Sequence, residues 1–424
     1  MDNPRLPHLF VAVPLLNENE RVGRLISCIQ NQDYKDFTLY FCVNQPDEWW
    51  HVSGKREICL QNKESLDILR KTLGSHAVII DRSSPGLGWR GRRHGVGWAR
   101  KTVMDAIEHQ AEEKDIILSM DADVTFSEHY FSSIASNFSN HPEAVALAVP
   151  YFHLPPEDPA AYRAILRYEI YMRMYSLNLW RIGSPYTFTA LGSAMACPVF
   201  AYRAIGGMTP KMSGEDFYFL QKLRKYGKMI FWNPEKIYPE ARFSDRVYFG
   251  TGPAMIRGNE GDWSSYPVYP YRFFDEIKTT TDLFPDFFEK TQFTGVVKFL
   301  QEQFLEEDPF QPIRRNAREK NQFVRACYEK FDGLRTLQYL KTRDKEEPSS
   351  WEKNLIDFLD KFFPDEWENL RKKLSSPFDF NLSSLSNLEM IRTFLTEKED
   401  ICQINSLPSL PGQQLPGVLW RNEP

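Results

Sequence analysis

The sequence contains no long apolar run. Its longest strongly apolar stretch, residues 144–152, is interrupted by Pro150 and falls far short of the ~20 residues that a membrane-spanning helix needs. Residues 1–8 carry two prolines and lead into a short apolar stretch that acidic residues follow, which is not the pattern of a secretory signal. We therefore expect no membrane span and a cytoplasmic protein, with peripheral membrane association left open.

Clustered cysteines and a strong excess of one charge are also missing. The six cysteines lie far apart, without a Cys-x-x-Cys pair or neighbouring histidines, so their spacing indicates neither a zinc site nor a disulfide framework. A total of 52 Lys and Arg against 57 Asp and Glu gives a net charge of −5, so no broad positive field attracts nucleic acid. We expect reduced thiols and no nucleic-acid partner.

The sequence does have ordinary globular composition and many aromatic residues. The chain has 424 residues, which is long enough for two domains with a sizeable core. Of these residues, 42% are hydrophobic and 26% are charged. Aromatic residues make up 14% of the chain. Most such rings fill cores, but flat apolar rings also line sugar-binding clefts.

Residues 1–258 alternate short apolar runs with charged helical segments, a pattern typical of a parallel sheet covered by helices. We expect strands over 9–15, 38–43, 77–80, 115–120 and 144–151, and helices over 20–30 and 97–113. Further along, Trp351, Leu355 and Phe358 recur at helical spacing. The sequence therefore predicts an α/β domain over 1–258 and a mainly α-helical region over 259–424, whose role it does not indicate.

Two carboxylates follow an apolar strand. Asp121 and Asp123, with one alanine between them, come directly after the expected strand 115–120. Ligands of α/β sheets bind at the carboxyl ends of strands, and paired carboxylates there can hold a hard divalent cation that neutralises a diphosphate. Asp-x-Asp sequences also occur as solvated turns, so the pattern alone leaves both interpretations open.

Polar residues also follow the first strand. Asn17 and Glu18 come directly after an apolar run, and the same edge argument places them beside the Asp-x-Asp pair. Their alternative role is structural, with Asn17 or Asn19 as the N-cap of the helix that follows.

A pair of carboxylates opens a later helix. Glu215 and Asp216 follow Gly214 and precede an amphipathic segment over 217–226. A carboxylate at such a junction is a candidate general base that takes a proton from a hydroxyl. The helix dipole alone also favours acidic residues there, which is the structural alternative.

A basic, glycine-rich segment spans residues 86–97. It contains the Gly-x-Gly-x-x-Gly pattern, but four residues separate it from the strand that ends near Asp81. Its Trp and Arg residues also replace the small apolar helix start that a dinucleotide-binding turn needs. We interpret it as a cationic loop suited to phosphate, with a solvated charge run as the alternative.

Taken in order, these features resemble the family-two glycosyltransferases with the GT-A fold. The matching segments are V-P-L-L-N-E at 13–18, G-V-G-W-A-R-K at 95–101, D-A-D at 121–123, L-G-S-A-M at 191–195 with I-G-G-M at 205–208, and G-E-D-F at 214–217. The resemblance covers about the first 258 residues. It implies a GT-A-type, Rossmann-like mixed sheet flanked by helices, in a soluble, non-processive enzyme.

The resemblance also implies roles for the matching residues. Asp121 and Asp123 would hold Mg²⁺ or Mn²⁺ on the donor diphosphate. Asp216 would serve as general base, and Glu215 would orient the acceptor or the base. Arg246 belongs to a segment similar to a phosphate-proximal one in some members, with a surface salt bridge as its alternative. The residues expected to contact the nucleotide-sugar are Pro14, Asn17, Glu18, Asn44, Arg100, Asp121, Gly192 and Arg246.

The sequence departs from the family pattern at several places. Leu16 stands where tyrosine is frequent, which removes a ring that would stack on the base. Asn44 and Gln45 replace an Asp pair after the second strand, which changes the hydrogen bonding to the base, and Lys101 stands where asparagine is common. The Q-x-x-R-W motif of processive synthases is absent from the sequence.

We therefore expect a metal-dependent hexosyltransferase that moves a sugar from a nucleoside-diphosphate sugar to an acceptor hydroxyl, with inversion at the anomeric carbon. The acceptor would be a glycan, a lipid-linked molecule or a small molecule. Two alternatives stay open: a nucleotidyltransferase that makes a nucleotide-sugar, and a non-catalytic carbohydrate-binding or scaffold protein on the same fold. A nucleotidyltransferase normally carries a Gly-rich, cationic signature directly after the first strand, where this chain has residues 14–20.

Overall fold

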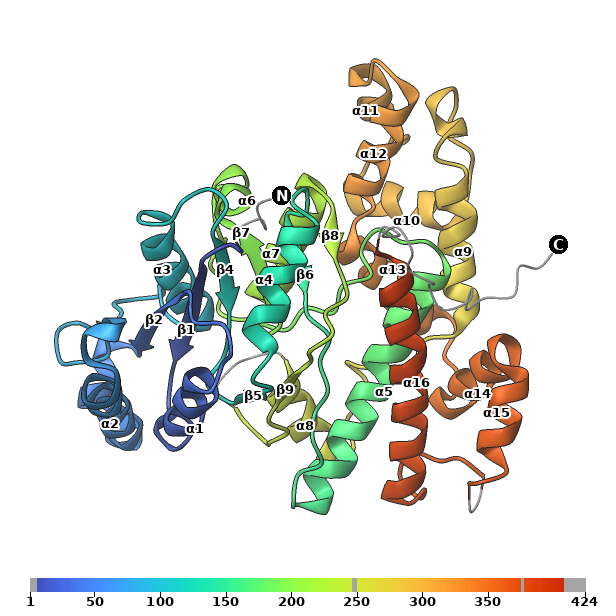
Figure 1. The fold of residues 1–424 in the computed structure, drawn as a ribbon. Coiled ribbons are helices and arrows are strands. Elements are labelled where there is room, and N and C mark those ends of the chain that lie inside the picture. The colour runs from blue at the N-terminus through green and yellow to red at the C-terminus, as the bar shows by residue number, and fades with distance from the viewer. Residues whose placement is uncertain (1–5, 246–249, 375–376, 408–424) are drawn as a thin grey trace, which may run out of the picture. The chain divides into compact units, whose positions relative to one another are not determined.

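The computed structural model describes residues 6–245, 250–374 and 377–407, which form two compact units (Figure 1). Of these residues, the first unit takes those up to Ile165, Phe188–Asp262 and 403–407, and the second takes Leu166–Thr187 and Trp263–Cys402. This division differs from the single boundary expected after residue 258. The reason is the long helix α5 (Pro159–Arg181), which begins in the first unit and continues in the second.

A seven-stranded mixed sheet forms the centre of the first unit. In the described part of the chain its order is β3-β2-β1-β4-β7-β6-β8, and β7 alone runs antiparallel to its neighbours. A second, two-stranded sheet pairs β5 and β9 in antiparallel orientation. The strands are β1 (Leu9–Leu15), β2 (Phe37–Asn44), β3 (Ala77–Arg82), β4 (Ile116–Ser119), β5 (Val124–Phe126), β6 (Ala146–Ala148), β7 (Met195–Pro198), β8 (Met229–Ile230) and β9 (Ile237–Pro239).

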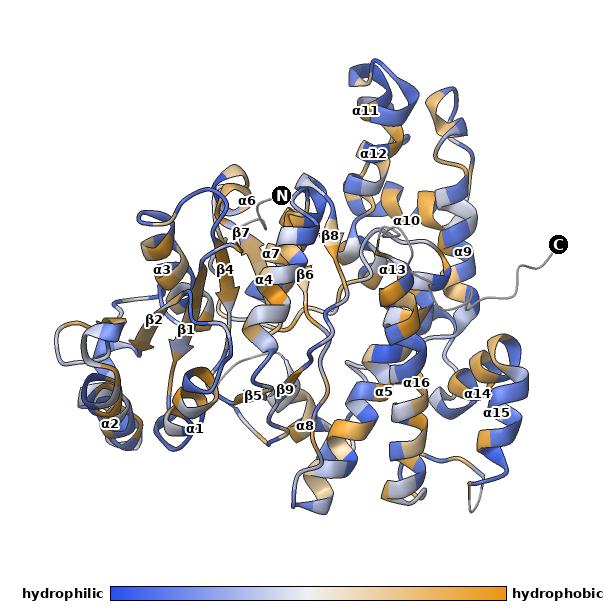
Figure 2. Ribbon diagram, in the orientation of Figure 1, coloured by the Kyte–Doolittle hydropathy of each residue, from blue (hydrophilic) through white to orange (hydrophobic). Residues whose placement is uncertain are grey.

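The central strands are apolar because helices flank the sheet. All seven residues of β1 are buried, and β1 lies between β2 and β4, with Leu9 opposite both Phe37 and Ile116. Figure 2 shows these strands in the hydrophobic colours, whereas α1 and α2 carry both colours. The helices of this unit are α1 (Asn19–Gln30), α2 (Arg56–Leu73), α3 (Val96–Glu108), α4 (Tyr130–Asn140), α6 (Val199–Ala204), α7 (Glu215–Tyr226) and α8 (Thr251–Asn259), with 3-10 helices at Asp47–His51, Ser53–Lys55 and Gly74–His76.

The expected α/β class, with a mixed sheet flanked by helices, is confirmed. The strands expected over 9–15, 38–43, 77–80 and 115–120 are present, with ends that differ by at most two residues. The strand expected over 144–151 is limited to Ala146–Ala148, and the helix expected over 97–113 ends at Glu108 because the chain turns before β4. The sequence did not indicate β7, whose four buried residues insert between β4 and β6.

The described residues of the second unit form helices joined by loops and contain no strand. Its buried core is rich in phenylalanine, and rings such as Phe284 and Tyr328 pack edge to face with centroids 5.0 Å apart. Much of the aromatic excess therefore serves as core. No described helix is both long enough and apolar enough to cross a bilayer. Besides α5, its helices are α9 (Tyr271–Asp282), α10 (Gly295–Phe304), α11 (Gln311–Asn316), α12 (Lys320–Lys330), α13 (Gly333–Glu346), α14 (Trp351–Phe362), α15 (Pro364–Arg371) and α16 (Leu385–Asn405), with a 3-10 helix at Asp286–Phe288.

Candidate active site

Arg100 joins four parts of the first unit in one hydrogen-bond network. It lies on α3 and is 1% exposed. Its Nη1 donates to the Ser119 hydroxyl at 2.6 Å and to the carbonyl oxygen of Gly192 at 2.9 Å. Its Nη2 donates to Oδ1 of Asp121 at 2.8 Å, and its Nε donates to Oε1 of Glu215 at 3.2 Å. The network therefore connects α3 with the end of β4, the segment before β7 and the start of α7.

Two carboxylates balance the charge of Arg100. Burial of a guanidinium disfavours its charged form, but Asp121 and Glu215 outweigh this effect and hold the pKa of Arg100 above its usual value. The side chain of Glu215 is 4% exposed, whereas that of Asp121 is 31% exposed. Asp121 is thus fixed by an ion pair on one side and reaches solvent on the other.

Two glycines allow these segments to approach one another. A Cβ atom at Gly192 would lie 2.3 Å from Nη2 of Arg100, which is closer than van der Waals contact permits. A Cβ atom at Gly97, in the first turn of α3, would lie 2.2 Å from the carbonyl oxygen of Lys211 and 3.1 Å from Cβ of Glu215. Glycine is therefore required both against the guanidinium and where α3 meets the segment before α7.

Asp216 lies beside this network in the first turn of α7. Gly214 precedes it with a φ of 74°, a left-handed conformation that favours glycine. Oδ1 of Asp216 accepts a hydrogen bond from the backbone N–H of Phe217 at 2.8 Å. Burial, and after it the charge of Glu215, raise the pKa of Asp216 to about 7, although Arg100 acts in the opposite direction. A carboxyl group with this pKa changes protonation near neutral pH, which suits a general base.

A second arginine bridges carboxylates beside the Asp-x-Asp segment. Nη2 of Arg242 lies 2.6 Å from Oε1 of Glu18 and 2.9 Å from Oδ2 of Asp123. The backbone N–H of Glu240 donates to the carbonyl oxygen of Asp123 at 2.9 Å, in continuation of the β5–β9 pairing. No local sequence pattern predicts the role of Arg242, because only the pairing of β5 with β9 brings this residue to Asp123. The sequence shows only a basic residue shortly after a short apolar segment.

The segment after β1 has an uncommon backbone conformation. Asn17 has a φ of 58°, which is rare for a residue other than glycine, and its backbone N–H donates to Oδ1 of Asn62 at 2.8 Å. Its own side-chain oxygen is buried and has no hydrogen-bond partner among the described residues. The N-cap of α1 is Glu18, and no side-chain hydrogen bond caps this helix in the described chain. The alternative capping role of Asn17 or Asn19 is therefore wrong. Pro14 lies within β1 and is buried.

The side-chain amides of Asn44 and Gln45 form hydrogen bonds within the protein. Asn44 is 2% exposed. Its Nδ2 donates to the carbonyl oxygen of Leu15 at 2.8 Å, and its Oδ1 accepts from Nε1 of Trp89 at 3.2 Å. Gln45 is also buried, and its Oε1 accepts from Nδ2 of Asn62 at 2.8 Å. Asn44 therefore positions the end of β1 and the Trp89 ring.

The cationic loop, residues 86–97, contains Trp89 and leads into α3. Arg90, Arg92 and Arg93 are exposed, and within the described residues none of the three side chains forms a hydrogen bond or an ion pair. These positive charges are available to an anionic ligand. Arg246, the other predicted phosphate contact, lies outside the described residues.

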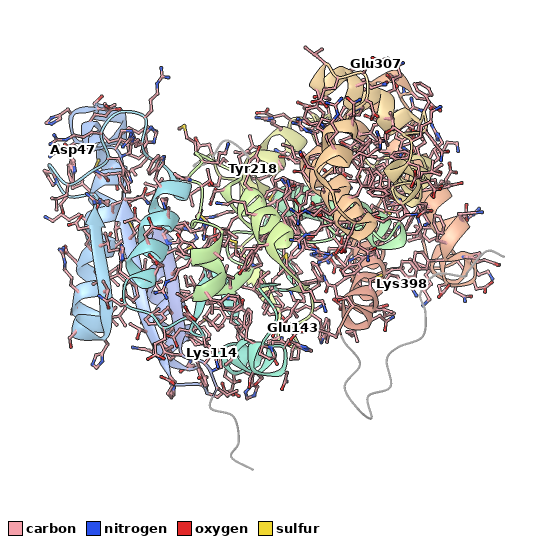
Figure 3. The ribbon with its side chains drawn as sticks, turned by 90° about the horizontal axis from the view of Figure 1, so that it is seen from above. Asp47, Lys114, Glu143, Tyr218, Glu307 and Lys398 are labelled. Atoms are coloured by element: carbon pink, nitrogen blue, oxygen red, sulfur yellow. The ribbon has the colours of Figure 1, made fainter. Side chains whose placement is uncertain are left out.

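The structure brings the other predicted residues to one side of the first unit. They lie at or just after the carboxyl ends of β1, β2 and β4 or in segments tied to them by the two arginines. In Figure 3, Asp47, after β2, and Tyr218, in α7, lie on this side, whereas Lys114 and Glu143, which precede β4 and β6, lie on the opposite side. Parallel strands place their carboxyl ends together, which is where ligands of such sheets bind.

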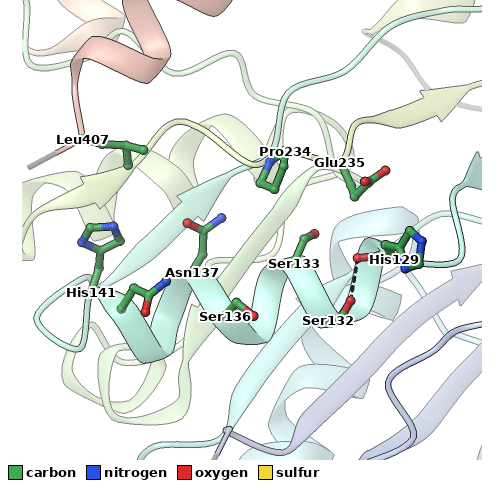
Figure 4. Close-up of a pocket in the computed structure, with 10 residues that line it drawn as sticks. His129, Ser132, Ser133, Ser136, Asn137, His141, Pro234, Glu235 and Leu407 are labelled. Atoms are coloured by element: carbon green, nitrogen blue, oxygen red, sulfur yellow. Dashed lines mark hydrogen bonds between the residues drawn. The ribbon is translucent and has the colours of Figure 1, made fainter. Parts of the chain in front are cut away.

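A separate cavity of about 360 Å³ lies along α4 (Figure 4). It contains none of the predicted site residues and is therefore not part of the candidate active site. Polar side chains predominate in its lining, among them His129, Ser132, Ser133, Asn137, His141 and Glu235.

The chain is similar in structure to several solved proteins but matches no family model. No family model and no curated protein matches this chain. S. aureus TarS 1-349 in complex with UDP-GlcNAc has a TM-score of 0.39 and 11% sequence identity, over 96% of this chain and 97% of that chain. The mannosyltransferase PcManGT from Pyrobaculum calidifontis, in complex with GDP-Man and Mn²⁺, has a TM-score of 0.32 and 13% identity, over 94% and 88% of the two chains. GalNAc-T7 with UDP, GalNAc and Mn²⁺ has a TM-score of 0.36 and 11% identity, over 72% and 56%. All three scores are low, so we infer the function of this chain from its own residues.

Replacement of Gly192 by alanine should destabilise the network around Arg100. The added Cβ atom would overlap the guanidinium, and overpacking of this kind typically costs about 1–3 kcal/mol of stability. Chemical denaturation of the Gly192→Ala variant measures this loss. Gly23→Ala is the matched control: no atom lies within 4 Å of a Cβ at Gly23 on α1, and alanine is the better helix former, so its stability should be unchanged or higher. A Gly192→Ala variant as stable as the wild type would contradict the packing described above.

Proposed function

We propose that this protein is a glycosyltransferase that moves a sugar from a nucleoside-diphosphate sugar to an acceptor hydroxyl. The observation that carries the proposal is the set of carboxyl groups around buried Arg100. Asp121, which the arginine fixes, is partly exposed at the end of β4, and nearby Asp216 has a pKa raised to about 7. Arg100 therefore fixes both the donor-side carboxylate and Glu215, the neighbour of the candidate base.

A diphosphate donor matches the charges at this side of the sheet. The exposed arginines of the cationic loop, Arg90, Arg92 and Arg93, lead directly to the N-terminus of α3. Arginine side chains and the backbone N–H groups of a helix N-terminus both bind phosphate. The nucleoside would then lie toward Asn17 and the ends of β1 and β2, with its diphosphate toward Asp121.

A divalent cation fits the two carboxylates of the Asp-x-Asp segment. Mg²⁺ is commonly held by one or two carboxylates together with substrate phosphates. A cluster of three or more protein ligands, which the described residues do not contain, is therefore not needed. Asp121 and Asp123 would be the protein ligands, with Mg²⁺ or Mn²⁺ as the cation. When bound, the cation would supply positive charge that stabilises the departing diphosphate.

The residues of the chain itself would carry the proton transfer. Asp216, in its charged form, would take the proton of the acceptor hydroxyl while the hydroxyl oxygen attacks the anomeric carbon and the bond to the diphosphate breaks. In-line attack of this kind inverts the anomeric centre. Arg100 holds the carboxylate of Glu215, whose charge raises the pKa of Asp216.

The released product tests the proposal against its alternatives. Incubation with a panel of UDP-, GDP- and other nucleotide-sugars and Mn²⁺ should release a nucleoside diphosphate, since a transferase slowly hydrolyses its own donor. Release of pyrophosphate would instead indicate a nucleotidyltransferase. Calorimetry that detects no binding of any nucleotide-sugar, with or without Mn²⁺, would favour a non-catalytic protein.

Substitution of Asp216 by asparagine should abolish most of the transfer. A positioned general base contributes about 10²–10⁴-fold to the rate, and asparagine cannot accept the proton. Donor affinity should stay close to that of the wild type, because Asp216 is assigned to the acceptor. Asp67→Asn, an exposed site on α2, is the control and should retain full activity. An active Asp216→Asn variant would remove Asp216 from the base role.

The activity should increase with pH around neutrality. The pKa of Asp216 is raised to about 7, and only its deprotonated form is a base, so kcat/KM should be low below this pH and reach a plateau above it. Glu215→Gln removes a charge that raises this pKa, so the rise should move to lower pH. Profiles recorded over roughly pH 5 to 9 measure both effects. A flat wild-type profile, or a shift to higher pH in the variant, would contradict the assignment.

Arg242 should compete with a divalent cation for Asp123. Its guanidinium lies 2.9 Å from Oδ2 of Asp123 and 2.6 Å from Oε1 of Glu18, so the Arg242→Gln variant should bind Mn²⁺ more tightly in the absence of nucleotide, by roughly tenfold for a contact of this kind. Titration calorimetry with MnCl₂ measures the change. Arg24→Gln, which removes an exposed partner of Glu240, should leave the affinity unaltered. Unchanged or weaker Mn²⁺ binding by Arg242→Gln would show that the arginine does not occupy the cation position.

A further inference from the structure

Trp89 lies where the ends of β2 and β3 meet. Its backbone N–H donates to the carbonyl oxygen of Gln45, and its carbonyl oxygen accepts from the N–H of Asp47, both at 2.9 Å. Pro46 forms a parallel bridge with Trp89. The N–H of Gln45 also donates to the carbonyl oxygen of Arg82 at 3.0 Å. The indole therefore stands at the carboxyl ends of these strands, on the side of the candidate active site.

The indole ring is held by its edge. Nε1 of Trp89 donates to Oδ1 of Asn44 at 3.2 Å, and the amide of Asn44 is itself fixed by the carbonyl oxygen of Leu15 in β1. A Cβ atom at Gly88 would lie 2.6 Å from Cα of Asp47, so glycine is required directly before Trp89. Because the hydrogen bond of the ring lies in its plane, this bond occupies neither flat face of the indole.

One face of the ring already carries a planar group. Cζ of Arg82 lies 5.2 Å from the ring centre, a cation–π contact. Arg82 is exposed, and within the described residues its side chain has no hydrogen bond or ion pair. The ring itself is only partly buried. A ligand can therefore displace Arg82 from this face at little cost.

We infer that Trp89 is the platform on which the base of the nucleotide donor stacks, an inference that rests on the proposed function. Leu16 supplies no ring at the end of β1, whereas Trp89 supplies one that Asn44, at the end of β2, holds beside the end of β1. Every nucleobase has a flat π face, so stacking of this kind binds bases of different identity. The exposed arginines 90, 92 and 93 come directly after Trp89. A base on the indole therefore places its phosphates beside the cationic loop.

Binding of nucleotides and of pyrophosphate, which has no base, tests the platform. Calorimetry with UDP, GDP, ADP, CDP and inorganic pyrophosphate is carried out on the full-length wild type, Trp89→Ala and Trp89→Phe. Trp89→Ala should weaken the binding of the preferred nucleoside diphosphate roughly tenfold or more, whereas Trp89→Phe should keep most of the affinity. Neither variant should alter the affinity for pyrophosphate. Trp351→Ala is the matched control, because that ring also has an arginine above it, with Cζ of Arg167 at 5.0 Å, but lies in the second unit.

Each other outcome overturns the inference in a distinguishable way. Nucleotide binding that Trp89→Ala leaves intact would remove the stacking role and leave the proposed function standing. Equal losses for nucleotide and pyrophosphate would show that Trp89 only holds the cationic loop in place. A wild type that binds none of the four nucleoside diphosphates would contradict the proposed function itself, and the platform with it.

Discussion

The burial of the Arg100 guanidinium constrains the whole candidate site. A buried guanidinium needs an acceptor for its N–H groups, and each one left unpaired costs about 1–3 kcal/mol. The acceptors come from distant parts of the chain: Ser119 and Asp121 at the end of β4, Gly192 before β7, and Glu215 at the start of α7. These segments must therefore take fixed positions together, and the site is ordered by the fold before a ligand arrives.

The carboxyl groups of the site differ in their partners. Arg100 pairs with Asp121 and Glu215, and Arg242 pairs with Asp123. The described residues give Asp216 no ion pair of its own. Its pKa is set by burial and by the charge of Glu215, which together exceed the opposing effect of Arg100 and raise it to about 7. Asp216 can therefore exchange a proton near neutral pH.

Local sequence patterns were sufficient for β1, β2, β3 and β4 and for the carboxylates that follow β4. The apolar run before Asp121 and the glycine before Glu215 predicted both places, because strand ends and helix starts are encoded by neighbouring residues. The insertion of antiparallel β7 into the sheet was not predictable, since its position depends on pairing with β4 and β6. Arg242 was missed for the same reason: it reaches Asp123 only through the β5–β9 pairing.

The hydrogen bonds of Asn44 explain why an amide suits this position at the end of β2. A carboxylate only accepts hydrogen bonds when ionised, whereas an amide both donates and accepts. Asn44 uses both capacities at once, donating to the carbonyl oxygen of Leu15 and accepting from the indole N–H of Trp89. An ionised aspartate at this position would face the Leu15 carbonyl with a second acceptor and would carry a buried charge. The amide at position 44 therefore matches the ring that it holds, because only an amide can donate to the Leu15 carbonyl and accept from the indole at once.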